Sequence, residues 1–295
     1  MTETSSTFLP GRLVILAVGA VAGLLSGLLG VGGGIVLVPL LTGFLGFEQH
    51  RAHAHSLAAI VLIAISGATT FTLAGEIDVV VGLSLGLGGV VGSNAGAHLM
   101  NRLSAVALRG VFGLIMIATG VRMVWGDGLS GSGGDLETLT TIGVAVGIGL
   151  VAGVASGVAG IGGGVVMVPA MIYLLGLEQH VAEGTSLVAI LFTAVAGTRV
   201  NLRHGQVDLG GAALIGIGGV ISAFVGARFA LGLSSATLAR VFGVLVVFVG
   251  LRMVVRLVLD ERMTSGRRDS DAPAGPADGR QEPRDIGEGE RDGHL

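Results

Sequence analysis

The sequence lacks cysteine and lysine, and it has few charged residues of any kind. Without cysteine, the chain cannot form disulfide bonds, use a thiol in catalysis or bind a metal through sulfur. Without lysine, all 17 basic residues are arginine, and the Gly-Lys-Ser/Thr sequence of a nucleotide-binding loop is excluded. Charged residues make up 13% of the chain, whereas soluble domains have about 25%. The main solvent of the chain is therefore predicted to be lipid.

What the sequence has instead is apolar residues and glycine. Hydrophobic residues make up 51% of the chain, glycine occurs 54 times, and the mean hydropathy is +0.84. Apolar runs long enough to cross about 30 Å of hydrocarbon recur through residues 12–258. Because lipid offers the backbone no hydrogen-bond partners, such runs are expected to be helices. The sequence predicts an all-α polytopic protein that crosses the cell membrane several times.

The apolar region is a duplication. The stretch GLLGVGGGIVLVP at 27–39 returns as GVAGIGGGVVMVP at 157–169, and Asp78 returns as Asp208. The same offset of 130 residues holds to the ends of both copies. Roughly forty of about a hundred aligned positions are identical, which predicts two homologous repeats of about 4–5 helical segments each. Asp78 and Asp208 follow short loops, and we expect both to cap the helices that they precede.

Composition divides the chain into five parts. The final 36 residues hold ten acidic residues, six arginines and almost nothing apolar, so they are expected to form a disordered tail. The parts expected are an N-terminal cytoplasmic segment (1–11), membrane repeat 1 (12–125), a polar linker (126–138), membrane repeat 2 (139–258) and a disordered acidic cytoplasmic tail (259–295).

The first two apolar runs of each repeat, such as 12–30 and 35–45, are short for two full crossings. Glycines let the chain turn between them, and Pro39 and Pro169 each remove a backbone N–H. We therefore expect broken half-helices, which cross twice or re-enter. With three further crossings, each repeat crosses the membrane an odd number of times, so the second copy is predicted to be inverted. That topology places most arginines on one side, and both termini are then predicted to be cytoplasmic.

The paired glycine clusters are the leading candidate for a binding site. Half-helices that start at Gly32–Gly34 and Gly162–Gly164 would point unpaired N–H groups and positive dipole ends at the midplane. Two opposed helix N-termini suit an anion, and Ser26 and Ser156 could add hydroxyl donors. The alternative is close helix packing through small residues. The candidate substrate-binding residues are Ser26, Gly30, Gly32, Gly33, Gly34, Ser156, Gly160, Gly162, Gly163, Gly164, Ser186, Arg199 and Arg228.

Two arginines lie in or near apolar runs. Arg199 is close to the end of one run and Arg228 is inside another. With His98 they could form a cationic pocket that balances an anionic substrate, because an ionisable group in a membrane usually faces a partner or a water-filled cavity. The alternative is that their long side chains reach the lipid headgroups.

Histidines gather just before the third run. His50, His53 and His55 could bind a metal, handle protons or lie at the membrane interface. The matching positions in the second repeat are His180, Glu183 and Thr185, and this mismatch argues against a metal in the core. The candidates for proton handling are His53, His55 and His98, and no metal or other cofactor is expected.

Several function classes have no residues to support them. The sequence contains no nucleophile–base pair, no paired carboxylates and no HExxH motif, so an enzyme is not expected. The membrane part is close to charge balance, which does not suit a nucleic-acid partner.

The chain resembles the sulfite exporter TauE/SafE family of membrane permeases. The resemblance rests on GLLGVGGGIVLVPLL, GVAGIGGGVVMVPAM and GTSLVAILFTAVAGTRVNLRHGQVDLGG (184–211), and it covers nearly all of 12–256. It implies a multispanning inner-membrane protein that moves small anions, chiefly sulfur oxyanions and organosulfonates. The first repeat departs from the Thr-Ser-Leu pattern of the second, with His55 in place of threonine.

From the residues and the resemblance together we expect a secondary permease for a small anion such as sulfite or a related sulfonate. Its partners would be the anionic substrate, the lipid bilayer and a coupling proton, and alternating access would come from one repeat rocking against the other. Two alternatives are a passive anion channel, and a membrane-bound sensor or assembly protein that uses the histidine loop or the tail.

Overall fold

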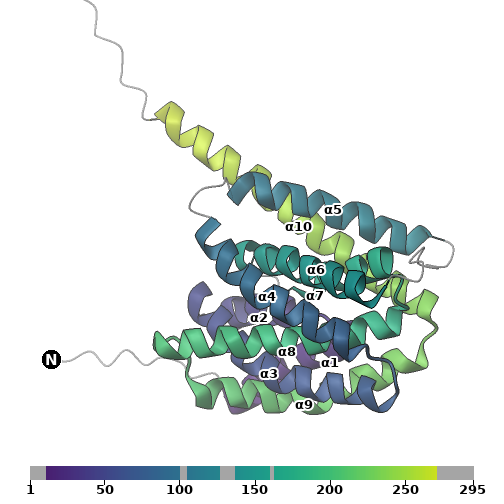
Figure 1. Ribbon diagram of the computed structural model, residues 1–295. Helices are drawn as coiled ribbons and strands as arrows, with labels where there is room; N and C mark the ends of the chain where they lie inside the picture. Colours follow the sequence, from purple (N-terminus) through teal and green to yellow (C-terminus); the bar gives the residue numbers. More distant parts are fainter. Residues whose placement is uncertain (1–10, 100–104, 127–136, 160–162, 271–295) are drawn as a thin grey trace, which may run out of the picture. The chain divides into compact units, whose positions relative to one another are not determined.

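A computed structural model describes residues 11–99, 105–126, 137–159 and 163–270, and within these residues every regular element is a helix. The all-α prediction is confirmed. The chain divides into two units, Met1–Leu257 and Val258–Leu295, and the arrangement below is that of the first unit. The elements are α1 (Arg12–Leu29), α2 (Gly34–Phe44), α3 (Gln49–Leu73), α4 (Val79–Leu99), α5 (Ala105–Trp125), α6 (Thr138–Ala159), α7 (Gly164–Ala170), the π-helix η1 (Met171–Leu175), α8 (Gln179–Arg203), α9 (Leu209–Gly232) and α10 (Ser235–Ser270) (Figure 1).

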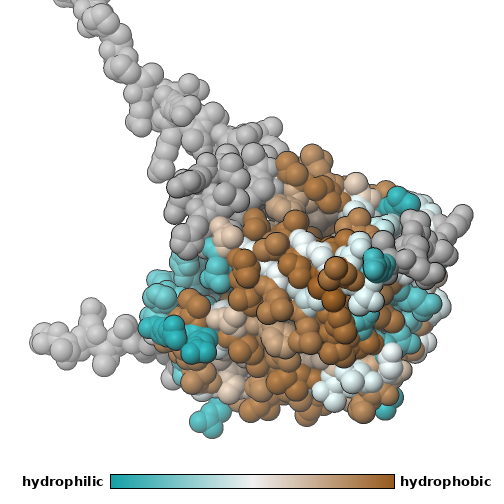
Figure 2. All heavy atoms as spheres, viewed as in Figure 1, coloured by the Kyte–Doolittle hydropathy of each residue, from teal (hydrophilic) through white to brown (hydrophobic). Residues whose placement is uncertain are grey.

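Six helices of the described chain are long and apolar enough to cross a membrane, namely α1, α3, α6, α8, α9 and α10. Large apolar side chains point outward on several of them, including Ile221 at 73% exposed and Phe229 at 62%. Figure 2 shows hydrophobic residues across the middle of one face and hydrophilic residues gathered toward both ends of the helices. A contiguous apolar surface of this extent suits lipid rather than water. The protein is a multi-pass membrane protein, as predicted.

The two repeats are inverted with respect to each other. In the centre of the bundle, α3 and α8 are repeat-matched helices that pack side by side. Gly67 of α3 lies against the side chain of Leu187, and Gly197 of α8 lies against that of Leu57. The two contacts are equivalent, because Gly67 corresponds to Gly197 and Leu57 corresponds to Leu187 at the repeat offset of 130 residues. Because the later residue of α3 meets the earlier residue of α8, the helices are antiparallel, and the predicted inversion is confirmed.

The most extensive helix pairs join one repeat to the other. Helix α1 packs along α9, and the repeat-matched pair α6 and α4 packs in the same way. Gly19 meets the backbone of Ile215 and Gly27 meets that of Ala223, so α1 and α9 run parallel. A Cβ on either glycine would collide with that backbone, which explains why small residues are needed here. The repeats are therefore interleaved rather than placed beside each other.

A peripheral pair shows the same inverted relationship. Gly113 of α5 lies against the backbone of Gly250, and Gly120 lies against that of Gly243. The later residue of α5 meets the earlier residue of α10, so these repeat-matched helices are also antiparallel.

The predicted broken half-helices are present. Helix α2 has 11 residues and is about 16 Å long, which is too short to cross the hydrocarbon. Its N-cap, Gly33, lies beside Ala22 in the middle of α1, and its last residues lead directly into α3. Helix α2 therefore re-enters rather than crosses. Helix α7 and η1 form the matching element in the second repeat, and the π-helix begins two residues after Pro169.

Candidate functional site

The first glycine segment, residues 30–34, carries the chain from α1 into α2. Gly30 has φ 64° and ends α1, while Gly32 and Gly33 have φ 73° and 72°. These are left-handed backbone conformations that side chains other than glycine adopt at a cost. The turn starts α2 at Gly34 in the protein interior, and the first N–H groups of a helix have no partner within it. Buried backbone donors of this kind suit an anion.

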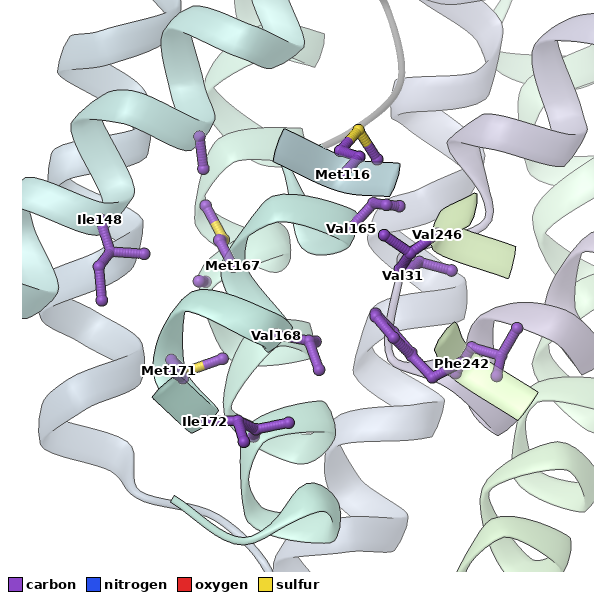
Figure 3. Packing of buried hydrophobic residues seen from close by; sticks show 14 of the residues in the cluster. Val31, Met116, Ile148, Val165, Met167, Val168, Met171, Ile172, Phe242 and Val246 are labelled. Carbon is purple, nitrogen blue, oxygen red and sulfur yellow. The ribbon is translucent and has the colours of Figure 1, made fainter. Parts of the chain in front are cut away.

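The second glycine segment, of which Gly163 and Gly164 are described, meets the first. A Cβ on Gly164 would lie 2.8 Å from Cα of Val31 and 3.0 Å from the carbonyl oxygen of Gly30. Val31 shares a buried cluster with Val165 at the start of α7 (Figure 3). Two segments 130 residues apart in sequence thus come into direct contact at the start of their half-helices. Gly160 and Gly162 lie outside the described residues.

Two isoleucines pack against the glycine segments. A Cβ on Gly32 would lie 2.7 Å from Cγ2 of Ile190, and a Cβ on Gly164 would lie 2.8 Å from its Cδ1. Ile60, the repeat-matched residue, approaches Gly34 in the same way at 3.3 Å. In this conformation the space beside the paired half-helix starts is filled by apolar side chains. Sequence reasoning missed this pair, although its repeat match was visible.

Ser26 is an unpartnered hydroxyl at this place. It is fully buried in α1, and its Oγ has no hydrogen-bond partner. Its Cβ is 3.5 Å from the position that a Cβ on Gly33 would take. A buried hydroxyl without a partner costs about 1–3 kcal/mol, a cost that a water molecule or a ligand beside the start of α2 would offset. Ser156, the matching residue of α6, is half-buried.

Ser186 has its hydrogen bonds within the protein. Its Oγ is within hydrogen-bond distance of the carbonyl oxygen of Gly30 and, at 2.7 Å, of that of Glu183. A hydroxyl has one proton, and two carbonyl acceptors already compete for it. In this conformation Ser186 therefore ties α8 to the first glycine segment.

The arginines are not brought to the glycine segments. Arg199 is exposed on α8, and Arg228 is exposed on α9 with its guanidinium carbon 5.5 Å from the ring centre of Phe224. A cation over an aromatic ring at this distance is weakly attractive. His98 belongs to α4, and its side chain lies outside the described part of the structure. A substrate-binding role for these three residues stays a prediction.

His55 holds the start of a helix in the other repeat. Its ring is buried, its Nε2 accepts the backbone N–H of Asp208 at 3.2 Å, and its Nδ1 lies 2.7 Å from the carbonyl oxygen of Arg51. An Nε2 that accepts leaves Nδ1 to donate, so both ring nitrogens have hydrogen-bond partners. In the second repeat Oγ1 of Thr185 accepts the N–H of Asp78 at 2.9 Å.

The two aspartates cap helices as predicted. The carboxylate of Asp208 accepts the N–H groups of Gly210 and Gly211, at 3.0 and 2.9 Å. Oδ1 of Asp78 accepts the N–H of Val81 at 3.0 Å. Each cap satisfies donors at the start of a helix, α9 or α4, that packs on the other repeat.

Glu183 was not among the site residues predicted from the sequence. This residue of α8 is fully buried, and its Oε1 accepts a hydrogen bond from Nε2 of Gln179 at 2.6 Å. Its Oε2 has no partner. The available signal was an acidic residue close to the start of an apolar run, at the position that His53 occupies in the first repeat. His53 itself is half-buried in α3.

Inverted, interleaved repeats whose broken half-helices meet in the interior define a class of polytopic membrane transporters. The comparisons with known proteins agree. The model of the sulfite exporter TauE/SafE family matches residues 2–123 and 145–284, and the chain belongs to this family.

Curated relatives carry transporter names. The chain is 30% identical over 222 residues to the probable membrane transporter protein YdhB of Bacillus subtilis, a match that covers 74% of this chain and 89% of the relative. A probable membrane transporter protein of Xylella fastidiosa is 28% identical, with 76% and 87% covered. The probable membrane transporter protein MJ0441 of Methanocaldococcus jannaschii is 26% identical, with 62% and 70% covered. Family and relatives together support a membrane transporter.

Proposed function

We propose that the protein is a secondary permease of the cell membrane that moves a small anion, with sulfite or a related sulfur oxyanion or organosulfonate as substrate. The observation that carries the proposal is the contact between the two glycine segments. There Gly164 reaches Val31 and Gly30, and the orphaned hydroxyl of Ser26 lies beside the start of α2. Backbone N–H groups and this hydroxyl would bind the anion without a buried cation.

Transport would follow from the inverted repeats. An inverted pair can exchange conformations, so that a site between the copies opens first to one side and then to the other. Ile60 and Ile190 pack against the glycine segments and would have to move away from them to admit the anion. Both termini would lie in the cytoplasm, in line with the arginine distribution.

A flux assay tests this function. The purified protein is reconstituted into proteoliposomes, and uptake of sulfite, sulfate, thiosulfate and a sulfonate is measured with and without a proton gradient. We expect sulfite or a sulfonate to be moved, and to accumulate against its own gradient when a driving gradient is present. Flux that only dissipates the anion gradient under every condition would identify a passive channel. No flux of any tested anion would contradict the proposal.

A further inference from the structure

We propose that Glu183 is the proton-binding group that couples anion movement to a proton gradient, an inference that rests on the proposed transport function. The neighbourhood of this carboxyl is the basis. Glu183 has no exposed surface, and its only side-chain hydrogen bond comes from the neutral amide of Gln179. An ionised carboxylate buried in this way would have no counter-charge, which is strongly unfavourable in an apolar interior.

The unpartnered atoms indicate a proton rather than a metal cation. Two buried oxygens of this pair have no hydrogen-bond partner, namely Oε2 of Glu183 and the amide oxygen of Gln179. Both atoms are acceptors, so neither can satisfy the other while Glu183 is ionised. A proton on Oε2 turns that atom into a donor, and a carboxylic acid and a primary amide can then exchange two hydrogen bonds. One proton on Glu183 would therefore give both oxygens a hydrogen-bond partner.

No charged side chain in the described part of the chain pairs with the carboxyl group of Glu183. Among the described residues, the titratable side chains on Glu183's own helix and on the elements around it make no hydrogen bond or ion pair with its side chain. These residues are His50, Arg51, His53 and His55 of α3, Glu76 and Asp78 of the α3–α4 turn, Tyr173 of η1, Glu178 before α8, His180, Arg199 and Arg203 of α8, Arg228 of α9 and Arg240 of α10. His180 is bonded instead to the carbonyl oxygen of Ala230 and to Ser235.

Glu183 also packs directly against the first glycine segment. A Cβ on Gly30 would lie 2.6 Å from the carbonyl oxygen of Glu183, 2.7 Å from its Cα and 2.9 Å from its Cβ. Ser186 adds a hydrogen bond from α8 to Gly30. When the first glycine segment moves relative to α8, the atoms that bury Glu183 must rearrange. Opening would admit water, the O–H bond of the acid would break, and the proton would pass to that water.

The first experiment does not depend on the transported anion. Infrared difference spectra of the membrane-reconstituted protein are recorded between neutral and high pH, where exposed carboxyl groups stay ionised, and the C=O band of a protonated carboxylic acid is measured. We expect the wild type to show this band and Glu183→Gln to lose it. Glu178→Gln is the matched control because Glu178 is exposed and precedes α8 by one residue, so this variant should keep the band. An unchanged band in Glu183→Gln would overturn the proposal.

The second experiment separates coupling from transport. Proteoliposomes containing each variant are loaded with sulfite, and sulfite exchange at equal pH is compared with sulfite accumulation under an imposed pH gradient. Glu183→Gln should exchange sulfite but fail to accumulate it, while Glu178→Gln does both. Accumulation by Glu183→Gln at the wild-type level, or accumulation that follows a sodium gradient instead, would overturn the proposal. A wild type that exchanges no anion, with the infrared band intact, would contradict the proposed function instead.

Discussion

The backbone N–H of Asp78 donates to Oγ1 of Thr185 at 2.9 Å, across the boundary between the two repeats. The inverted contact joins Asp208 to Nε2 of His55 at 3.2 Å. The same structural position is thus served by a hydroxyl in one repeat and an imidazole in the other. Each contact fixes the start of a helix from one repeat against the central helix of the other.

Replacing Thr185 with valine tests the contribution of this contact to stability. The change keeps the shape of a fully buried side chain but removes the acceptor of the Asp78 N–H. We expect a loss of about 1 kcal/mol or more in the free energy of unfolding, since one buried donor loses its partner. Thermal unfolding in detergent measures it. Thr69→Val is the control, because Thr69 is exposed and bonds only within its own helix. Equal stability of both variants would contradict the prediction.

Replacing Gly19 with alanine tests the interleaved packing. The new Cβ would collide with the backbone of Ile215, so α1 and α9 would have to separate. We expect a large loss of folded protein, measured as the monodisperse fraction in gel filtration. Gly147→Ala is the control, because a Cβ on Gly147 of α6 meets nothing within 4 Å. Equal yields from the two variants would mean that α1 and α9 do not approach as described.

Replacing Ser26 with alanine separates binding from folding. The Oγ of Ser26 makes no hydrogen bond, so losing this hydroxyl should leave thermal stability unchanged or raise it. A hydrogen bond to a charged group contributes about 1.5–3 kcal/mol, so the apparent affinity for the anion should fall roughly tenfold or more. Ser84→Ala is the control, since its Oγ bonds to Val80 in its own helix. An unchanged KM for Ser26→Ala would remove this residue from the site.

Replacing Ile190 with alanine tests the apolar closure. This side chain reaches both Gly32 and Gly164, and its truncation would leave a gap between the half-helix starts. We expect faster anion leak that no longer depends on the driving gradient, measured as the ratio of passive to gradient-driven flux. Ile221→Ala serves as the control, because this side chain is 73% exposed on α9. A leak of the same size in both variants would argue against a closing role.

Much of the fold follows from the sequence because the duplication is nearly gapless. The offset that matches Gly67 to Gly197 predicts two equivalent helices, and the odd number of crossings predicts that they run in opposite directions. The caps at Asp78 and Asp208 follow from their local sequence alone. Re-entry of α2 could not be decided from the sequence, because a glycine turn permits a second crossing as well.

The site was only partly predictable for a physical reason. An offset shows which residues correspond, but it does not show which helix packs on which. The contact of α1 with α9 depends on interleaving that no periodicity reveals. Arg228 was marked by its place inside an apolar run, yet the face of α9 that carries it is exposed. Glu183 was close to a helix start, where an interfacial position was the natural expectation.

Sulfite flux through proteoliposomes of Gly34→Leu, Gly163→Leu and Gly43→Leu tests anion binding between the half-helix starts most directly. Gly34 and Gly163 lie at the starts of α2 and α7, and neither has a left-handed backbone conformation. Gly43, in contrast, is exposed near the end of α2. A side chain at position 34 would meet Ile60, and one at position 163 would meet Met167 and Ala152, so both would crowd the half-helix starts. With all three variants folded and inserted, we predict that Gly34→Leu and Gly163→Leu lose transport and Gly43→Leu keeps it. Wild-type sulfite flux in both of the first two variants would contradict a site at this place.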